Sequence, residues 1–223
     1  MKYFFAAGSR SGSEFSIRLI STLVGKILEP FGRVHSARES QGDLSPPYSF
    51  YKQHGKVQDF VNFHRLEALK LEDPGVDDDA YVMFDSFPEA IVIATYRPLY
   101  KIINSHGNIK PWGMSPEKVQ RTWYNNLRFY EHAHKHNRLV MISLENREAF
   151  VPATAASLLG CEVSSDWKGF WEKWPVVNDL ETQKKVSNDV SESTFHMSRE
   201  EVLTKYPDCE LQDARYKKLV WSN

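Results

Sequence analysis

The sequence predicts a single α/β domain with a central, mainly parallel sheet flanked by helices. Three observations favour this class. Short, continuous apolar runs alternate along the chain with longer segments of helical periodicity, as in strand–helix–strand units. The 223 residues are enough for one well-buried core but few for two. Hydrophobic residues make up 41% and charged residues 26%, which is an ordinary globular composition.

The chain begins with a predicted strand, turn and helix. Residues Tyr3–Ala7 form a continuous apolar run, which suits a strand buried on both faces. A small, flexible turn follows at 8–13. From Glu14 apolar residues recur at helical spacing as far as Leu28, and Pro30 ends the helix. The opening apolar run is too short for the core of a signal peptide, so we expect a soluble, cytoplasmic protein.

The later elements follow from the same two periodicities. Apolar residues at 60, 63, 66 and 69 predict a helix, and the chain from 90 to 96 is apolar enough for a strand in mid-sheet. The expected order is helix Val57–Glu72, strands Tyr81–Phe84 and Ala90–Tyr96, helices from Pro98 and over Pro116–His136, strand Leu139–Ile142 and helix Ala149–Leu159. The tail, 175–223, is polar and weakly periodic, and we expect a poorly defined C-terminal appendage.

Charge and composition exclude several classes of function. The net charge of −1 gives no general reason to expect nucleic acid or an anionic membrane as a partner. No segment approaches the roughly 20 apolar residues of a membrane span. The two cysteines cannot form a disulfide framework. On a helix, His132 and His136 share a face and His134 points elsewhere, so these histidines predict no metal site.

The first candidate site for a bound anion is the turn Gly8–Ser13, between a buried strand and an amphipathic helix. The N-terminus of a helix offers unpaired N–H groups and the positive end of a dipole. Glycines let the backbone approach an anion, and Arg10 adds a fixed charge. The alternative is structural, because Ser11 and Glu14 fit a capping box. Glu14 also places negative charge where an anion would lie.

The second candidate is Arg97, which follows the predicted strand Ala90–Tyr96. In open α/β sheets, ligands bind at the carboxyl ends of the strands. Ser105 follows eight positions later on the next predicted helix and could reach the same anion. In the alternative interpretation, Arg97 pairs with a carboxylate at the strand end and Ser105 is ordinary helix surface.

Together the two segments resemble the P-loop sulfotransferases in their bacterial-type form. The family's loop for a 5′-phosphosulfate resembles Ser9-Arg10-Ser11-Gly12-Ser13. Its 3′-phosphate motif is similar to the Phe-Pro-Glu-Ala strand that ends at Arg97, with Ser105 eight residues later. Weaker similarities are a strand end at 143–146 and a Leu-Leu-Gly at 158–160. The resemblance implies one P-loop domain over 1–223, with 33–80 as an acceptor-side insert.

The resemblance also implies an activity. A sulfotransferase of this family moves a sulfuryl group from 3′-phosphoadenosine-5′-phosphosulfate (PAPS) to a hydroxyl or amine, releases PAP and needs no metal. Arg10 and the loop N–H groups would hold the transferred charge, Arg97 and Ser105 would anchor the 3′-phosphate, and Phe15 would contact the adenine. The implied donor-binding residues are Ser9, Arg10, Ser11, Gly12, Ser13, Glu14, Phe15, Arg97 and Ser105.

The acceptor side is less defined. The family places a histidine or a carboxylate before the strand that ends at Arg97, so Asp85 is the expected general base beside the catalytic Arg10, with His54 and His64 as further candidates. The acceptor would be a small molecule or a glycan, and we expect no nucleic acid and no membrane as partners. The sequence does not indicate the acceptor's identity or the oligomeric state.

Departures from the family pattern keep two other functions open. Arg10 stands where many members have lysine, Glu14 replaces a hydroxyl residue, and no convincing late Arg-Lys-Gly segment follows, 165–169 being a faint similarity. These differences fit a P-loop module that still binds a nucleotide but has lost its catalytic activity. A nucleotide kinase is disfavoured, because the loop lacks Gly-Lys-Ser/Thr and no magnesium-holding aspartate follows a later strand.

Overall fold

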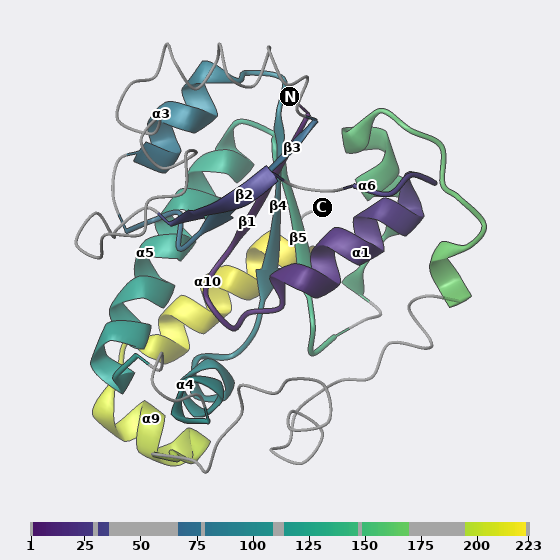
Figure 1. The fold of residues 1–223 in the computed structure, drawn as a ribbon. Helices are drawn as coiled ribbons and strands as arrows, with labels where there is room; N and C mark the ends of the chain where they lie inside the picture. The colour runs from purple at the N-terminus through teal and green to yellow at the C-terminus, as the bar shows by residue number, and fades with distance from the viewer. Residues whose placement is uncertain are drawn as a thin grey trace.

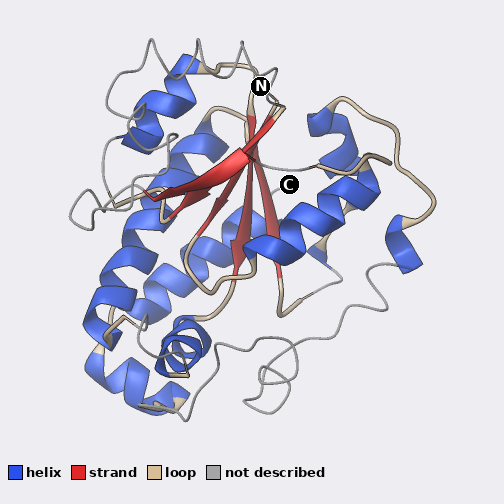
Figure 2. Ribbon diagram, in the orientation of Figure 1, coloured by secondary structure: helices blue, strands red, loops and turns tan. Residues whose placement is uncertain are grey.

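The central feature of the computed structural model is a five-stranded parallel sheet in the order β2-β3-β1-β4-β5. The structure describes residues 2–28, 31–35, 67–76, 79–108, 114–146, 149–169 and 195–221. The strands are β1 Tyr3–Ala7, β2 Phe31–His35, β3 Ala68–Glu72, β4 Ile91–Tyr96 and β5 Leu139–Ser143. Figure 2 shows them as one twisted layer between helices. The predicted fold class is confirmed.

Helices cover both faces of the sheet (Figure 1). One face carries α1 Ser13–Leu23 and α6 Pro152–Leu159. The other carries α3 Asp79–Ser86, α4 Leu99–Gly107, α5 Pro116–Lys135, α9 Arg199–Lys205 and α10 Cys209–Trp221. Each face has its own apolar cluster, and β1 contributes alternate residues to the two, Phe4 to one and Phe5 to the other. This double burial explains the continuous apolar run from which β1 was predicted.

Two predicted elements have the wrong type. Residues 68–72 form strand β3, not the end of a helix, and 79–86 form helix α3 where a strand was predicted at 81–84. The spacing of three that suggested a helix ends at Leu69, which pairs instead with Phe4 of β1. In α3 the buried residues are Ala80, Met83 and Phe84, a helical spacing hidden in a short apolar run. The expected helix residues 57–66 lie outside the described residues.

Helix α1 ends at Leu23, five residues earlier than predicted. Gly25 has a φ of +65°, the left-handed conformation that terminates many helices. Its N–H donates to Thr22 O at 3.2 Å, and the Lys26 N–H donates to Ser21 O at 3.0 Å. This pair of bonds is the Schellman motif, and it turns the chain before Pro30 is reached.

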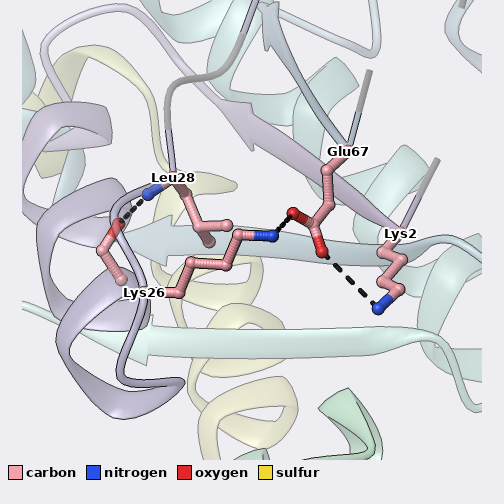
Figure 3. Close-up of polar contacts among 5 residues, drawn as sticks. Lys2, Lys26, Leu28 and Glu67 are labelled. Atoms are coloured by element: carbon pink, nitrogen blue, oxygen red, sulfur yellow. Dashed lines mark hydrogen bonds and ion pairs between the residues drawn. The ribbon is translucent and has the colours of Figure 1, made fainter. Parts of the chain in front are cut away.

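Charged pairs close the amino-terminal edge of the sheet beside this turn. The Lys26 and Lys2 ammonium groups both point to the Glu67 carboxylate just before β3 (Figure 3). The Lys2–Glu67 distance is 3.5 Å. These contacts lower the pKa of Glu67, chiefly through the hydrogen bond from Lys26. The pairs are partly solvent-exposed and lie at the opposite end of the strands from the candidate site.

Parts of the expected insert and of the expected C-terminal appendage belong to the sheet and the core. Strand β3 and the end of β2 fall inside the expected insert 33–80, yet β3 lies between β1 and β2. Helix α10, from the expected appendage 175–223, packs on α5 and the sheet, with Tyr216 and Leu219 buried. Residues 36–66 and 175–194 of these regions lie outside the described residues.

Candidate anion-binding site

The parallel topology brings the ends of three strands to one edge. Because β1 is paired with both β3 and β4 in parallel, the residues that follow these strands lie close together. The loop Gly8–Gly12 follows β1, Asp73 follows β3 and Arg97 follows β4. The two segments singled out in the sequence therefore share an edge.

The loop after β1 is held in a tight, hydrogen-bonded conformation. Ser11 donates its N–H to Gly8 O at 3.1 Å and its Oγ–H to the same oxygen at 2.6 Å. Ser11 Oγ also lies 3.0 Å from Thr95 Oγ1, which ties the loop to β4. Gly12 is the N-cap of α1 and no side chain caps the helix, so Ser11 does not form the predicted capping box. The first N–H groups of α1 keep the orientation that favours an anion.

Two loop residues have positive φ. Gly12 adopts +99°, and an added Cβ would lie 2.5 Å from Leu144 Cδ1. Arg10 adopts +63°, a conformation that costs a non-glycine residue roughly 1–2 kcal/mol. Strain of this kind persists only where surrounding contacts hold it. For Arg10 those contacts come from the second segment.

The side chains of the two segments contact each other. Arg10 Nε donates to Ser105 Oγ at 3.1 Å, and Arg97 Nη1 donates to the backbone oxygen of Arg10, also at 3.1 Å. Ser105 is buried, which contradicts its interpretation as ordinary helix surface. Arg97 is 8% exposed, and its backbone oxygen accepts the indole N–H of Trp123 at 3.3 Å. Two guanidinium groups and a hydroxyl thus gather beside the N-terminus of α1.

The charge of Arg97 is buried at this edge. Burial lowers the pKa of Arg97, the nearby Glu145 carboxylate raises it, and the positive charge of Arg10 lowers it. An arginine stays protonated even so, because its ordinary pKa lies far above neutral pH. Taking such a charge out of water is costly unless an anion compensates it. Glu145 offsets part of this cost, and an anionic ligand would offset more of it.

Asp73 is a site residue that the sequence analysis missed. Its Oδ1 accepts the Ser9 N–H at 2.8 Å and the Asn126 side-chain amide at 3.3 Å. Asn126 Oδ1 accepts the Gly75 N–H at 2.9 Å. A Cβ on Gly75 would lie 2.0 Å from the backbone oxygen of Asn125, so this close approach requires glycine. The carboxylate at the end of β3 is thereby fixed against the loop.

The expected base, Asp85, lies elsewhere. It is exposed on α3, and its negative charge acts on His132 and Arg138. Arg138 precedes β5 and donates to Ala90 O, just before β4, at 2.8 Å. This is the amino-terminal edge of the sheet, opposite the loop. Asp85 is therefore withdrawn as a site residue, because its predicted strand is a helix that leads away from the carboxyl edge, where the loop lies.

The other predicted residues have varied positions. Phe15 is 6% exposed and belongs to the apolar cluster under α1, so it packs in the core rather than standing in the open beside the loop. Ser13 is the first residue of α1 and Glu14 the second. His54 and His64 lie outside the described residues.

A small cavity lies behind the loop, between α4 and α5. Its volume is about 20 Å³, enough for one water molecule. Tyr130 and His106 both line it. His106 Nδ1 accepts the Met114 N–H at 3.4 Å. Burial, aided by the charge of Arg10, lowers the pKa of His106 to about 4, so this imidazole is neutral at pH 7.

Metal-binding clusters and membrane-spanning helices are both absent from the described part of the chain. No group of three or more histidine, cysteine, aspartate or glutamate side chains there could hold a metal ion. None of the helices in the same residues is both long and apolar enough to cross a bilayer.

Similarity to known proteins is found in structure but not in sequence. No family model matches this chain, and no protein with a curated description matches it. Among solved structures, the chain is similar to mouse sulfotransferase SULT7A1 complexed with PAP. The identity is 11%, the match covers 98% of this chain and 82% of the other, and the TM-score is 0.46.

Proposed function

We propose that the protein is a sulfotransferase that binds PAPS at the carboxyl edge of the sheet and transfers its sulfuryl group to a hydroxyl or amine. One observation carries the proposal. The loop after β1 and the segment after β4 meet through the contacts of Arg10 with Ser105 and of Arg97 with the Arg10 backbone. A ligand with anionic groups at two ends is what two adjacent anion-binding segments would hold.

The residues present fit such a donor. Ser13 begins α1, so the N–H groups of the first turn are available to an anionic group. Gly12 lets the backbone approach that group without a side chain in the way. The guanidinium groups of Arg10 and Arg97 supply charge and planar donors. Ser105 supplies a hydroxyl that already accepts from Arg10.

In the proposed reaction the acceptor oxygen or nitrogen bonds to sulfur while the bond from sulfur to the bridging oxygen breaks. PAPS supplies the activated sulfuryl group. The protein's part is positioning and charge stabilisation, as in phosphoryl transfer. Arg10 and the N–H groups at the start of α1 hold the developing negative charge, and Arg97 and Ser105 hold the 3′ end. Phe15, packed under α1, supports the loop from below.

Asp73 takes the place of Asp85 as our candidate for the group that accepts the acceptor's proton. It lies beside the loop, and the Ser9 N–H and the Asn126 amide orient its carboxylate. A general base must lie within hydrogen-bond reach of the proton that it removes. Asp85, at the opposite edge, does not meet this condition.

The second candidate function is a nucleotide-binding module without chemistry. One observation favours it, because Asp73 Oδ1 already accepts two hydrogen bonds that hold the loop, which is a sufficient structural role. The two candidates share the ligand and differ only in turnover. A sulfate-transfer assay with PAPS and a panel of phenols, amines and glycans separates them.

Ligand binding is tested by the thermal stability of the protein with PAP, without metal, and with ATP with and without Mg²⁺. A ligand at a hundred times its dissociation constant stabilises the native state by about 2.7 kcal/mol. We expect stabilisation by PAP without metal. Stabilisation by Mg²⁺–ATP alone would indicate a kinase, and no shift with either nucleotide would contradict both candidate functions.

A further inference from the structure

A lysine shares the α4 face that carries the proposed 3′-phosphate site. Arg97, Lys101 and Ser105 are four residues apart in succession. Residues four apart on a helix lie one above the other, so Lys101 and Ser105 share one face of α4, and Arg97 precedes its first turn. Lys101 is thus a third cationic side chain at this edge, beside Arg97 and Arg10.

The partner of Lys101 is a carboxylate that follows the neighbouring strand, β5. Lys101 Nζ forms an ion pair with Glu145 Oε2, and the two side chains are 20% and 24% exposed. Glu145 lies in the turn after β5. The Leu144 N–H donates to Tyr96 O at 3.2 Å, and the Asn146 N–H donates to Ser143 Oγ at 3.0 Å. The turn is therefore fixed to the end of β4.

The same carboxylate serves the buried arginine. Glu145 raises the pKa of Arg97, against the larger lowering by burial, so its negative charge acts on both Arg97 and Lys101. Leu144, the preceding residue, packs against Gly12 at the start of α1. Glu145 therefore stands beside two cations, Lys101 and Arg97, at the place where the proposed donor's 3′-phosphate would bring its own negative charge.

We propose that Lys101 is a further ligand of the donor's 3′-phosphate and that Glu145 is the counter-ion that this phosphate displaces. The inference rests on the proposed function, because it assigns residues to the same donor. It also accounts for one way in which the sequence departs from the sulfotransferase pattern. The chain carries no convincing Arg-Lys-Gly segment, and in this proposal Lys101 supplies positive charge from α4 instead. The binding of a 3′-phosphate would then exchange one anion for another across a fixed set of cations.

The competing explanation is a structural clamp. In that case the Lys101–Glu145 pair only fixes the turn after β5 to α4, and the loss of either partner would loosen the site equally. The two explanations predict opposite signs for Glu145. Removing a clamp weakens donor binding, whereas removing a competing carboxylate strengthens it.

The test is calorimetric titration of PAP and of adenosine 5′-monophosphate, which lacks the 3′-phosphate, into the wild type and three variants. For Lys101→Ala we expect about tenfold weaker PAP binding, as for a lost charged hydrogen bond, and less than about twofold for the monophosphate. Lys101→Arg keeps the charge and should restore most of the PAP affinity. Glu145→Gln should bind PAP about three- to tenfold more tightly at low salt, with a smaller gain at high salt.

The matched control is the Lys26–Glu67 pair at the opposite edge (Figure 3). Lys26→Ala and Glu67→Gln change the net charge by the same amounts and should leave the PAP dissociation constant unchanged within about twofold. This control separates a local contact from the general effect of charge.

Three results would overturn the inference. They are an unchanged PAP affinity in Lys101→Ala, equal losses for PAP and the monophosphate, and weaker PAP binding in Glu145→Gln. A wild type that binds no PAP would instead remove the proposed function itself, so the two failures are distinguishable.

Discussion

Arg97 and Arg138 lie at opposite ends of neighbouring strands, Arg97 just after β4 and Arg138 just before β5. Burial lowers the pKa of both, and neighbouring carboxylates partly reverse this. Arg138 donates its hydrogen bonds to backbone oxygens. Its Nε donates to Ala90 O at 2.8 Å, its Nη2 to Phe87 O at 2.6 Å, and both of its Nη atoms to Phe84 O at 3.1 Å. Its guanidinium also lies 3.6 Å from the centroid of the Phe84 ring.

Arg97 has a different setting. Its Nη1 donates to the strained Arg10 of the loop, and its charge faces Glu145. At the amino edge the guanidinium closes the end of α3 and the turn before β4, whereas at the carboxyl edge it joins a group of cations. Burial and pKa alone therefore do not separate a structural arginine from a ligand-binding one. The two are separated by the edge of the sheet at which each lies and by the chemistry of the groups that each contacts.

The largest effect is expected from Arg97→Ala, which should weaken PAP binding roughly a thousandfold, or about 4 kcal/mol. The reason is the loss of a buried charge together with the bond that holds Arg10 in place. Titration calorimetry at fixed salt measures it. An unchanged PAP affinity would contradict the assignment of Arg97 to the site.

Arg138→Ala is the matched control for that variant. Three backbone oxygens lose a charged donor and Phe84 loses its cation, so we expect the free energy of unfolding to fall by about 3 kcal/mol. The PAP affinity of the folded fraction should stay within about twofold of the wild type. Urea unfolding monitored by circular dichroism measures the stability. A large loss of PAP affinity here would remove the distinction between the two edges.

The next prediction compares two histidines. His106 lies behind the loop at the carboxyl edge, and His132 lies at the amino edge. The folded pKa of His106 is about 4, below the ordinary value of 6.5. The unfolded chain therefore binds the extra proton first, and the stabilisation that is complete above pH 6.5 is lost as the pH falls to 4. The loss is about 3 kcal/mol. For the less buried His132, burial and the charge of His136 lower the pKa in the same direction.

The measurement is the free energy of urea unfolding between pH 7 and pH 4 for the wild type and His106→Gln. Because other groups titrate in both proteins, the difference between the two curves isolates His106. The wild type should lose about 3 kcal/mol more than the variant over this range. Parallel curves would show that His106 is not held neutral behind the loop.

The sequence predicts elements well where local periodicity and burial agree. The bounds of β1 are as predicted, because both of its faces are buried and the run is wholly apolar. In β3, Leu69 and Leu71 alternate with a buried Lys70, and this pattern is too short to outweigh the spacing of three that precedes it. Only pairing with β1 and β2 decides that it is a strand.

The residues of the site were predicted well only where the element that carries them was predicted correctly. Arg97 and Ser105 could be singled out because they follow a recognisable strand at a fixed spacing. Asp73 was hidden because its strand was mistaken for a helix, and Asp85 was selected because its helix was mistaken for a strand. Nothing in the sequence around His106 predicts that it is buried, apart from its position next to Ser105. The side chains that bury it come from α5 and from the loop after β1, which are distant in the sequence.

The smallest expected effect compares two glycines at the two ends of α1. Gly12 and Gly25 both have positive φ, +99° and +65°. A Cβ on Gly25 would meet nothing within 4 Å, whereas one on Gly12 would lie 2.5 Å from Leu144 Cδ1. Gly25→Ala should therefore cost only the backbone strain, about 1 kcal/mol, and Gly12→Ala about 2 kcal/mol, because Leu144 must also move. Since Leu144 adjoins Glu145, Gly12→Ala alone should also weaken PAP binding, severalfold in a titration. Equal losses of unfolding free energy and equal PAP affinities in the two variants would show that the loop tolerates a side chain where the donor is proposed to approach.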